Sequence, residues 1–240
     1  MTALHDPWAI LDRAEDQAWL RRPGPALVRG ALQQALLFPA ARLIARPRVT
    51  GAGDLAAVSQ PAVIAANHAS DLDTPLVLAA LPRAWRARTV VAAAEDRFHR
   101  STRVAVATSL WIDVFPFDRS SDGRGLAQAA RFLEAGRNVL LYPQGTRSAG
   151  LAGFRGGGGR LCVAAGVPLV PVYVGGTALL MPKGRGILQR GSTTVRFGRP
   201  LAPAPGEEGD AFSERASAAI AALVPAGRSS PSTSRSRRRA

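Results

Sequence analysis

Residues 62–73, AVIAANHASDLD, join a short apolar run to a polar turn that carries a histidine and two aspartates. The apolar run follows Pro61 and ends before Asn67, a pattern typical of a buried strand in an α/β sheet. Thr74-Pro75 then reads as a helix N-cap followed by proline at the first helical position. We therefore expect His68 at the carboxyl end of a strand and near a helix N-terminus, where open α/β sheets bind ligands.

The composition sets the size of the core and the sign of the surface. The chain has 240 residues, of which 47% are hydrophobic, enough for one substantial core. A formal net charge of +14 favours anionic partners such as phosphates, acidic lipid surfaces, acidic carrier proteins or nucleic acid. Lys183 is the only lysine, so a general preference for arginine also explains part of this charge. Charge alone selects no partner.

Cysteine and histidine usage gives further expectations. Cys162 is the only cysteine, which excludes an internal disulfide framework, and the three histidines show no zinc-like spacing. We expect no metal site and a reduced, cytoplasmic setting. The first residues carry Asp6 and Asp12 instead of a basic segment leading to an apolar one, so no signal peptide is expected.

The chain divides into three expected segments. Residues 1–48 should form amphipathic helices, one over residues 6–20 and one from Ala26 to Ala45. Residues 49–225 should form a single α/β domain with a mostly parallel sheet flanked by helices. Residues 226–240 should form a disordered basic tail, because they are rich in serine and arginine and lack a large apolar residue.

The second N-terminal helix has two possible positions. Its uncharged part between Arg29 and Arg42 contains two glutamines and Pro39, and falls short of the roughly 20 apolar residues that a bilayer span needs. The helix can lie on a membrane surface or pack on the core, and the sequence leaves both open.

The remaining elements follow from apolar periodicity. Apolar runs predict strands at 89–94, 111–115, 139–142, 169–174 and 193–197. Helical spacing predicts helices at 124–135, 161–165 and 210–223. The glycine-rich stretch 150–159 reads as a loop.

His68 and Asp73 are the first candidates for chemistry. Their spacing lets the carboxylate turn back onto one imidazole nitrogen, which would make the other nitrogen a general base. Such a pair alone is more often a histidine satisfied by a local contact, so other stretches have to support it.

Three later stretches give that support. The first is a strand ending at Asp118-Arg119, and the second is Tyr142 to Ser148, followed by Phe154-Arg155-Gly156-Gly157. The third, Val167 to Val172, reads V-P-L-V-P-V. Together with residues 67–73, which fit N-H-x-S-x-x-D, they form four ordered blocks that resemble the glycerolipid acyltransferase family, which includes 1-acyl-glycerol-3-phosphate acyltransferases. Residues 142–148 are similar to the family's F-P-E-G-T-R-S, and residues 167–172 to its V-P-[IV]-V-P-V.

The resemblance implies transfer of a fatty acyl group from acyl-CoA or acyl carrier protein to a lyso-phospholipid hydroxyl. The expected acceptor is 1-acyl-glycerol-3-phosphate, and the product phosphatidic acid. His68 would take the hydroxyl proton while Asp73 orients it, with no covalent acyl-enzyme and no cofactor beyond the acyl co-substrate. The expected location is cytoplasmic, on the inner face of a membrane.

The resemblance also assigns the binding residues. Arg119, Thr146 and Arg147 would hold the acceptor phosphate, which suits the bidentate geometry of guanidinium groups. Gln144, Gly145 and Arg155 would form the substrate-binding loop. Gln144 stands where the family has glutamate, and this departure leaves the acceptor open.

Three alternatives follow from the same residues. The base could activate water, which gives a thioesterase, or the acceptor could lack a glycerol phosphate. A non-catalytic basic protein that binds membranes or nucleic acid is the third. Nucleic acid is disfavoured because no basic helix interleaved with aromatic residues is present.

Overall fold

The computed structural model describes residues 21–94, 111–118, 123–148, 150–151, 154–182 and 188–225. The expected helix at 6–20, the tail 226–240 and Arg119 lie outside this range. No helix in the described ranges is long and apolar enough to cross a membrane.

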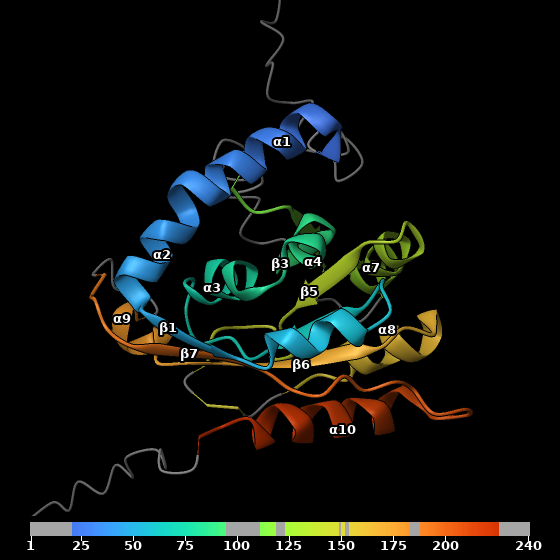
Figure 1. Cartoon of the computed structure of the whole chain (residues 1–240). Coiled ribbons are helices and arrows are strands. Elements are labelled where there is room, and N and C mark those ends of the chain that lie inside the picture. Colours follow the sequence, from blue (N-terminus) through green and yellow to red (C-terminus); the bar gives the residue numbers. More distant parts are fainter. Residues whose placement is uncertain are drawn as a thin grey trace, which may run out of the picture.

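The centre of the domain is a sheet of seven described strands in the order β1-β7-β6-β2-β5-β3-β4 (Figure 1). The five strands from β6 to β4 are parallel, as expected, whereas β7 runs antiparallel to β6 and β1 runs with β7. The strands are β1 (Pro47–Thr50), β2 (Val63–Ala66), β3 (Thr89–Ala94), β4 (Val114–Phe117), β5 (Asn138–Leu141), β6 (Leu169–Gly175) and β7 (Thr193–Phe197).

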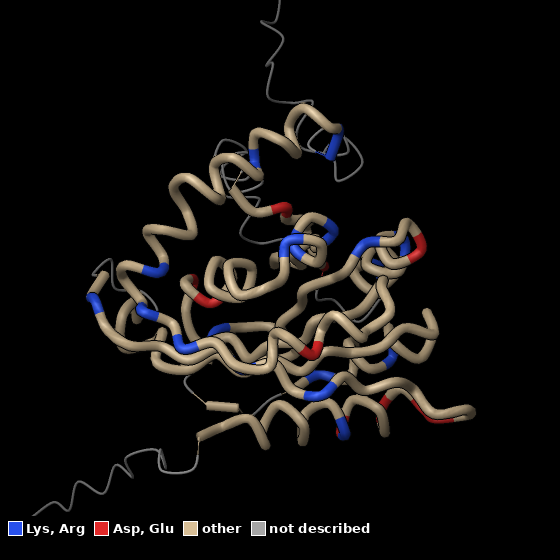
Figure 2. Tube along the Cα trace, viewed as in Figure 1, with Lys and Arg blue, Asp and Glu red and all other residues tan. Residues whose placement is uncertain are grey.

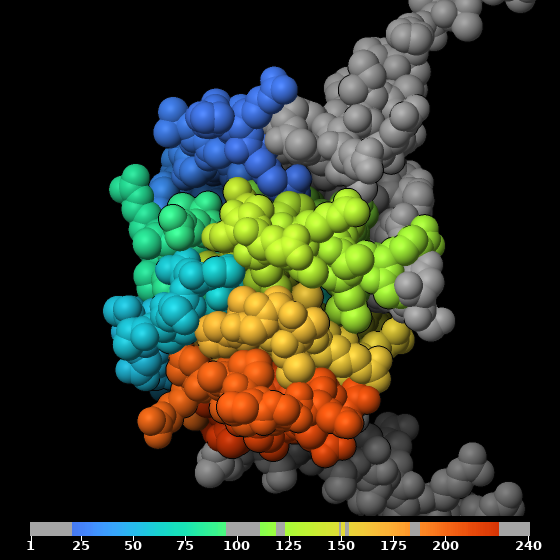
Figure 3. All heavy atoms as spheres, turned by 90° about the vertical axis from the view of Figure 1, so that its right-hand side faces the viewer, coloured from blue at the N-terminus to red at the C-terminus, as the bar shows by residue number. Residues whose placement is uncertain are grey.

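Helices cover both faces of the sheet, which is why β2 is apolar at every position. Ile64 and Ala66 pack into one core, and Val63 and Ala65 into the other. The first core is closed by α2 (Phe38–Ala45), α3 (Asp73–Ala80), α4 (Arg83–Ala87) and the 3₁₀ helix η4 (Ala52–Ala57). The second is closed by α7 (Arg124–Glu134), α8 (Gly157–Ala165) and α10 (Gly209–Ala222), and α7 and α8 lie side by side in Figure 3. A short helix, α9 (Thr177–Leu180), follows β6.

The expected helix at 26–45 is present as one helical run of α1 (Pro23–Leu32), a π-helical turn η3 (Gln33–Leu37) and α2. Pro39 follows the π turn, and a proline lacks the N–H that a regular helix would need there. The run arches over the sheet (Figure 1). Phe38, Ala41 and Ala45 are buried, while Leu27, Leu36 and Leu43 are more than half exposed.

A buried ion cluster fastens the start of this arch. Asp113, just before β4, pairs with Arg21 and Arg29 at 3.1 Å each and also with Arg137. Burial lowers the pKa of Arg21 and Arg29 below the ordinary arginine value, although the Asp113 charge opposes the shift. The cluster thus joins the N-terminal helical run to the edge of the sheet.

Two sequence predictions about these elements were wrong in detail. The strand predicted at 111–115 is β4 at 114–117, because Asp113 turns its carboxylate into the ion cluster and Pro116 is tolerated in an edge strand. The predicted loop 150–159 ends early, since Gly157 to Gly159 belong to α8. A Cβ on Gly159 would lie 2.1 Å from the Ser213 hydroxyl, so glycine is needed where α8 crosses α10.

Candidate active site

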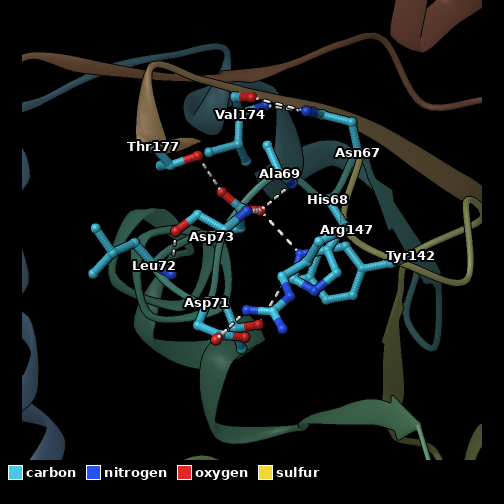
Figure 4. A network of polar contacts seen from close by, with 12 residues as sticks. Asn67, His68, Ala69, Asp71, Leu72, Asp73, Tyr142, Arg147, Val174 and Thr177 are labelled. Carbon is cyan, nitrogen blue, oxygen red and sulfur yellow. Dashed lines mark hydrogen bonds and ion pairs between the residues drawn. The ribbon is translucent and has the colours of Figure 1, made fainter. Parts of the chain in front are cut away.

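Three adjacent central strands, β6, β2 and β5, deliver the candidate site at their carboxyl ends. His68 follows β2, Tyr142 follows β5, and Thr177 follows β6. Because parallel strands end on the same edge of a sheet, residues far apart in the sequence meet there (Figure 4).

Asp73 is fully buried and accepts hydrogen bonds from four described donors. Its Oδ2 accepts from the backbone N–H of Ala69 at 2.7 Å, from that of Ser70 at 2.8 Å, and from Nδ1 of His68 at 2.9 Å. Its Oδ1 accepts from the Thr177 hydroxyl at 2.6 Å. These donors satisfy a carboxylate that would be costly to bury alone, and they fix its orientation.

His68 is held on its ring edge and on its ring face. Donation from Nδ1 to Asp73 assigns the proton to that nitrogen and leaves a lone pair on Nε2. The imidazole stacks on the Tyr142 ring with centroids 4.1 Å apart and an interplanar angle of 23°. The His68 side chain is 14% exposed, so a small part of it remains accessible.

Tyr142 supports this stack as a neutral phenol. Burial, with the negative charge of Asp73, raises the pKa of Tyr142 well above the ordinary tyrosine value. Its hydroxyl lies 2.6 Å from the Thr74 hydroxyl. The prediction that Thr74 caps the helix was wrong, because α3 begins at Asp73. Thr74 instead contacts the hydroxyl of Tyr142, on whose ring His68 stacks.

The loop that carries His68 is tied to the end of β6 and to α9. The Asn67 amide donates to Val174 O at 2.9 Å and accepts from Val174 N–H at 2.7 Å, which extends the pairing of β2 with β6 by a side chain. The Ser70 hydroxyl donates to Met181 O at 3.0 Å. Gly176 turns the chain between β6 and α9 with φ +89°, where a Cβ would lie 2.8 Å from Ser192 O. Residues 67–73 are therefore held in place by side-chain hydrogen bonds to β6 and the end of α9.

The side chain of Gln144 holds the backbone of His68 in place. Its side chain is buried, with Oε1 accepting from the His68 backbone N–H at 2.8 Å and Nε2 donating to Gly150 O at 2.6 Å. One partner is a donor and the other an acceptor, so an amide fits both, whereas a glutamate would fit only the first. This pairing gives a physical reason for the departure from the family pattern.

The other predicted binding residues that the structure describes, Gly145, Thr146, Arg147 and Arg155, lie in the same loop as Gln144 or follow it in the chain. Arg147 Nη1 lies 2.6 Å from Asp71 Oδ2, and the backbone N–H of Ser148 donates to His68 O at 2.8 Å. Thr146 and Arg155 are exposed. Gly145 has φ +68°, and a Cβ there would lie 3.3 Å from Arg155 Nε, so the guanidinium lies against the loop.

The structure thus brings His68, Asp73, Gln144 and Arg147 together, while Arg119 lies outside the described residues. Sequence reasoning missed Thr177, whose only signal is its place after Gly175-Gly176 at the end of a predicted strand. Within the described ranges, no group of three histidine, cysteine or acidic side chains could hold a metal ion.

These features define an α/β protein with a histidine–aspartate pair at the carboxyl ends of its central strands. The chain belongs to the Acyltransferase family, whose pattern matches residues 46–175, more than half of the chain. The fold resembles the crystal structure of the 1-acyl-sn-glycerophosphate acyltransferase PlsC from Thermotoga maritima, with a TM-score of 0.61 and 20% identity over 89% of this chain and 93% of that one.

Two curated relatives match part of the chain. A 1-acyl-sn-glycerol-3-phosphate acyltransferase of Chlamydomonas reinhardtii is 35% identical over 111 residues, which cover 45% of this chain and 33% of that protein. A chloroplastic 1-acyl-sn-glycerol-3-phosphate acyltransferase of Arabidopsis thaliana is 29% identical over 165 residues, which cover 64% of this chain and 43% of that protein. The chain therefore spans less than half the length of both.

Proposed function

We propose that this protein transfers a fatty acyl group from a thioester, on coenzyme A or acyl carrier protein, to the free hydroxyl of 1-acyl-glycerol-3-phosphate. The observation that carries the proposal is the 2.9 Å contact between His68 Nδ1 and the buried Asp73 carboxylate. It leaves Nε2 as the proton acceptor at the carboxyl edge of the sheet. The family and the names of the relatives support the reaction class.

The reaction then needs one base and no covalent enzyme intermediate. Nε2 of His68 takes the proton of the acceptor hydroxyl while the oxygen attacks the thioester carbonyl carbon. The carbon–sulfur bond breaks, and the thiolate leaves with the proton that the imidazolium returns. Cys162 has no part in this step, because it is buried and burial raises its thiol pKa to about 12.

The acceptor phosphate is assigned to Arg147, which lies beside His68 (Figure 4), and to Arg155. The backbone contact of Ser148 with His68 holds Arg147 next to the base, and Arg155 lies against the same loop. Guanidinium groups bind phosphate through two parallel N–H donors, which gives both charge and orientation. Arg119 and Thr146 complete the set by the family pattern.

We also propose that the outer face of the α1–α2 arch lies on a membrane surface, on the cytoplasmic side. Leu27, Leu36 and Leu43 are 77%, 55% and 58% exposed, although the opposite face of the arch packs on the core. Basic residues lie along the arch and around α4 (Figure 2). Exposed leucines beside arginines suit an interface with anionic lipid, where the acceptor resides.

The test is an acyl-transfer assay with labelled acyl-CoA or acyl carrier protein and 1-acyl-glycerol-3-phosphate. Wild-type protein should form phosphatidic acid, and His68→Ala should lose nearly all turnover while remaining folded by circular dichroism. Wild-type turnover in purified His68→Ala would overturn the mechanism.

Free-thiol release, followed in the same assay, separates the alternatives. Release without any lipid acceptor would indicate a thioesterase. Product formed only with unphosphorylated acceptors would show that the acceptor is not a glycerol phosphate lipid. Absence of thiol release with both donors and all acceptors would favour a non-catalytic binding protein.

A further inference from the structure

The guanidinium assigned to the acceptor phosphate already has an anionic partner inside the catalytic loop. Arg147 Nη1 lies 2.6 Å from Oδ2 of Asp71, which stands between His68 and Asp73 in the sequence. Figure 4 shows this pair beside the His68 ring. Both side chains are partly shielded from water, with Arg147 21% and Asp71 35% exposed. The pair therefore occupies one side of the place where the acceptor would bind.

The backbones on both sides of this pair are fixed. Ser70 and Asp73 flank Asp71 and are held by Met181 and Thr177, while Ser148 holds the Arg147 backbone to His68. Asp71 can therefore leave the guanidinium by side-chain rotation but cannot withdraw from the site. Any anion that binds Arg147 meets this carboxylate at short range.

We propose that Asp71 is a specificity-determining residue that competes with the acceptor phosphate for Arg147, an inference that rests on the function proposed above. The carboxylate cancels the charge of Arg147 in the free protein, so a phosphate has to displace it and then lies close to a second negative charge. Asp71 therefore weakens the binding of phosphorylated acceptors without taking part in proton transfer. The buried, uncharged Gln144 adds no further negative charge to the loop.

The test compares steady-state kinetics of wild type, Asp71→Asn and Asp54→Asn with 1-acyl-glycerol-3-phosphate. Asp54 is an exposed carboxylate on η4, so its substitution changes net charge equally without touching Arg147. We expect Asp71→Asn to lower KM about fivefold, the upper range for a partly exposed ion pair, with kcat within about twofold of wild type. Asp54→Asn should leave KM unchanged. An unchanged or higher KM in Asp71→Asn would overturn the proposal.

A binding measurement separates this inference from the proposed function. Titration of sn-glycerol 3-phosphate, followed by phosphorus NMR, should show tighter binding to Asp71→Asn than to wild type. In an Arg147→Gln background, the Asp71→Asn change should give clearly less tightening, because only the direct repulsion between Asp71 and the phosphate remains. If wild type transfers no acyl group but this pattern holds, the competition stands and the function fails. If wild type is active but the binding constants are equal, the competition fails alone.

Discussion

The Thr177 hydroxyl donates a 2.6 Å hydrogen bond to Oδ1 of Asp73, and both side chains are fully buried. The two residues are 104 positions apart and meet because β6 lies next to β2 in the sheet. Asp73 thus has one oxygen committed to its own loop and His68, and the other to α9. The orientation of Asp73, and with it that of the proposed base His68, depends on a segment outside residues 67–73.

Replacing Thr177 by valine should slow acyl transfer, because Asp73 would lose one of the hydrogen bonds that fix its orientation. The change keeps the shape of the side chain but leaves Oδ1 without this donor in a buried site, at a cost of about 1–3 kcal/mol. We expect kcat to fall about tenfold, equivalent to about 1.4 kcal/mol of the barrier, with little change in KM. Thr177→Ser should recover most of the rate. Equal losses in the serine and valine variants would show that the hydroxyl has no role.

Gln144→Glu, which restores the residue of the family pattern, should impair this protein. A carboxylate could still accept from the His68 N–H, but its second oxygen would face Gly150 O without a proton between them. We expect a loss of about 1–3 kcal/mol in the free energy of unfolding, measured by chemical denaturation, and a lower kcat. A more stable or faster Glu variant would show that Gln144 is not held by these two contacts.

Vesicle co-sedimentation tests the proposed membrane face. The triple variant Leu27→Ser, Leu36→Ser and Leu43→Ser removes exposed apolar surface from the arch and should not disturb the core. We expect it to lose most binding to vesicles of phosphatidylcholine and phosphatidylglycerol while its melting temperature stays within a few degrees of wild type.

Truncation after residue 227 tests how much the positive charge of the C-terminal residues contributes to vesicle binding. It removes arginines from the C-terminal end of the sequence, so it should mainly reduce the dependence on anionic lipid and on salt. Wild-type binding by the leucine variant, together with lost binding after truncation, would assign membrane contact to the tail.

The central strands were predictable because a strand covered on both faces is a continuous apolar run. β2, β3, β5 and β6 were predicted within about two residues for this reason. The start of β4 was not, because the decisive contact of Asp113 is an ion cluster with arginines from other elements. The antiparallel direction of β7 depends on tertiary pairing and leaves no local pattern in the sequence.

The contacts of the candidate site also divide into local ones, which were predictable, and long-range ones, which were not. The contact between His68 and Asp73 was predictable because only four residues separate them in the chain. Thr177 was not, because a single threonine after a strand is common and only the neighbouring strand gives it a partner. The two contacts of Gln144 were not predictable either, since they depend on where the fold places the His68 N–H and Gly150 O.

Glycine to alanine substitutions test why α8 begins with glycines. A Cβ on Gly159 would lie 2.1 Å from the Ser213 hydroxyl and 2.7 Å from Gly209 O, so α8 and α10 would have to move apart. We expect Gly159→Ala to cost about 3 kcal/mol in the free energy of unfolding, typical of overpacking at a buried contact. Gly30→Ala is the matched control, because Gly30 is helical and its Cβ would meet no atom within 4 Å. That variant should be stabilised by up to about 1 kcal/mol, since alanine favours helix. Similar destabilisation of both proteins in urea titrations would mean that the α8–α10 contact does not require glycine.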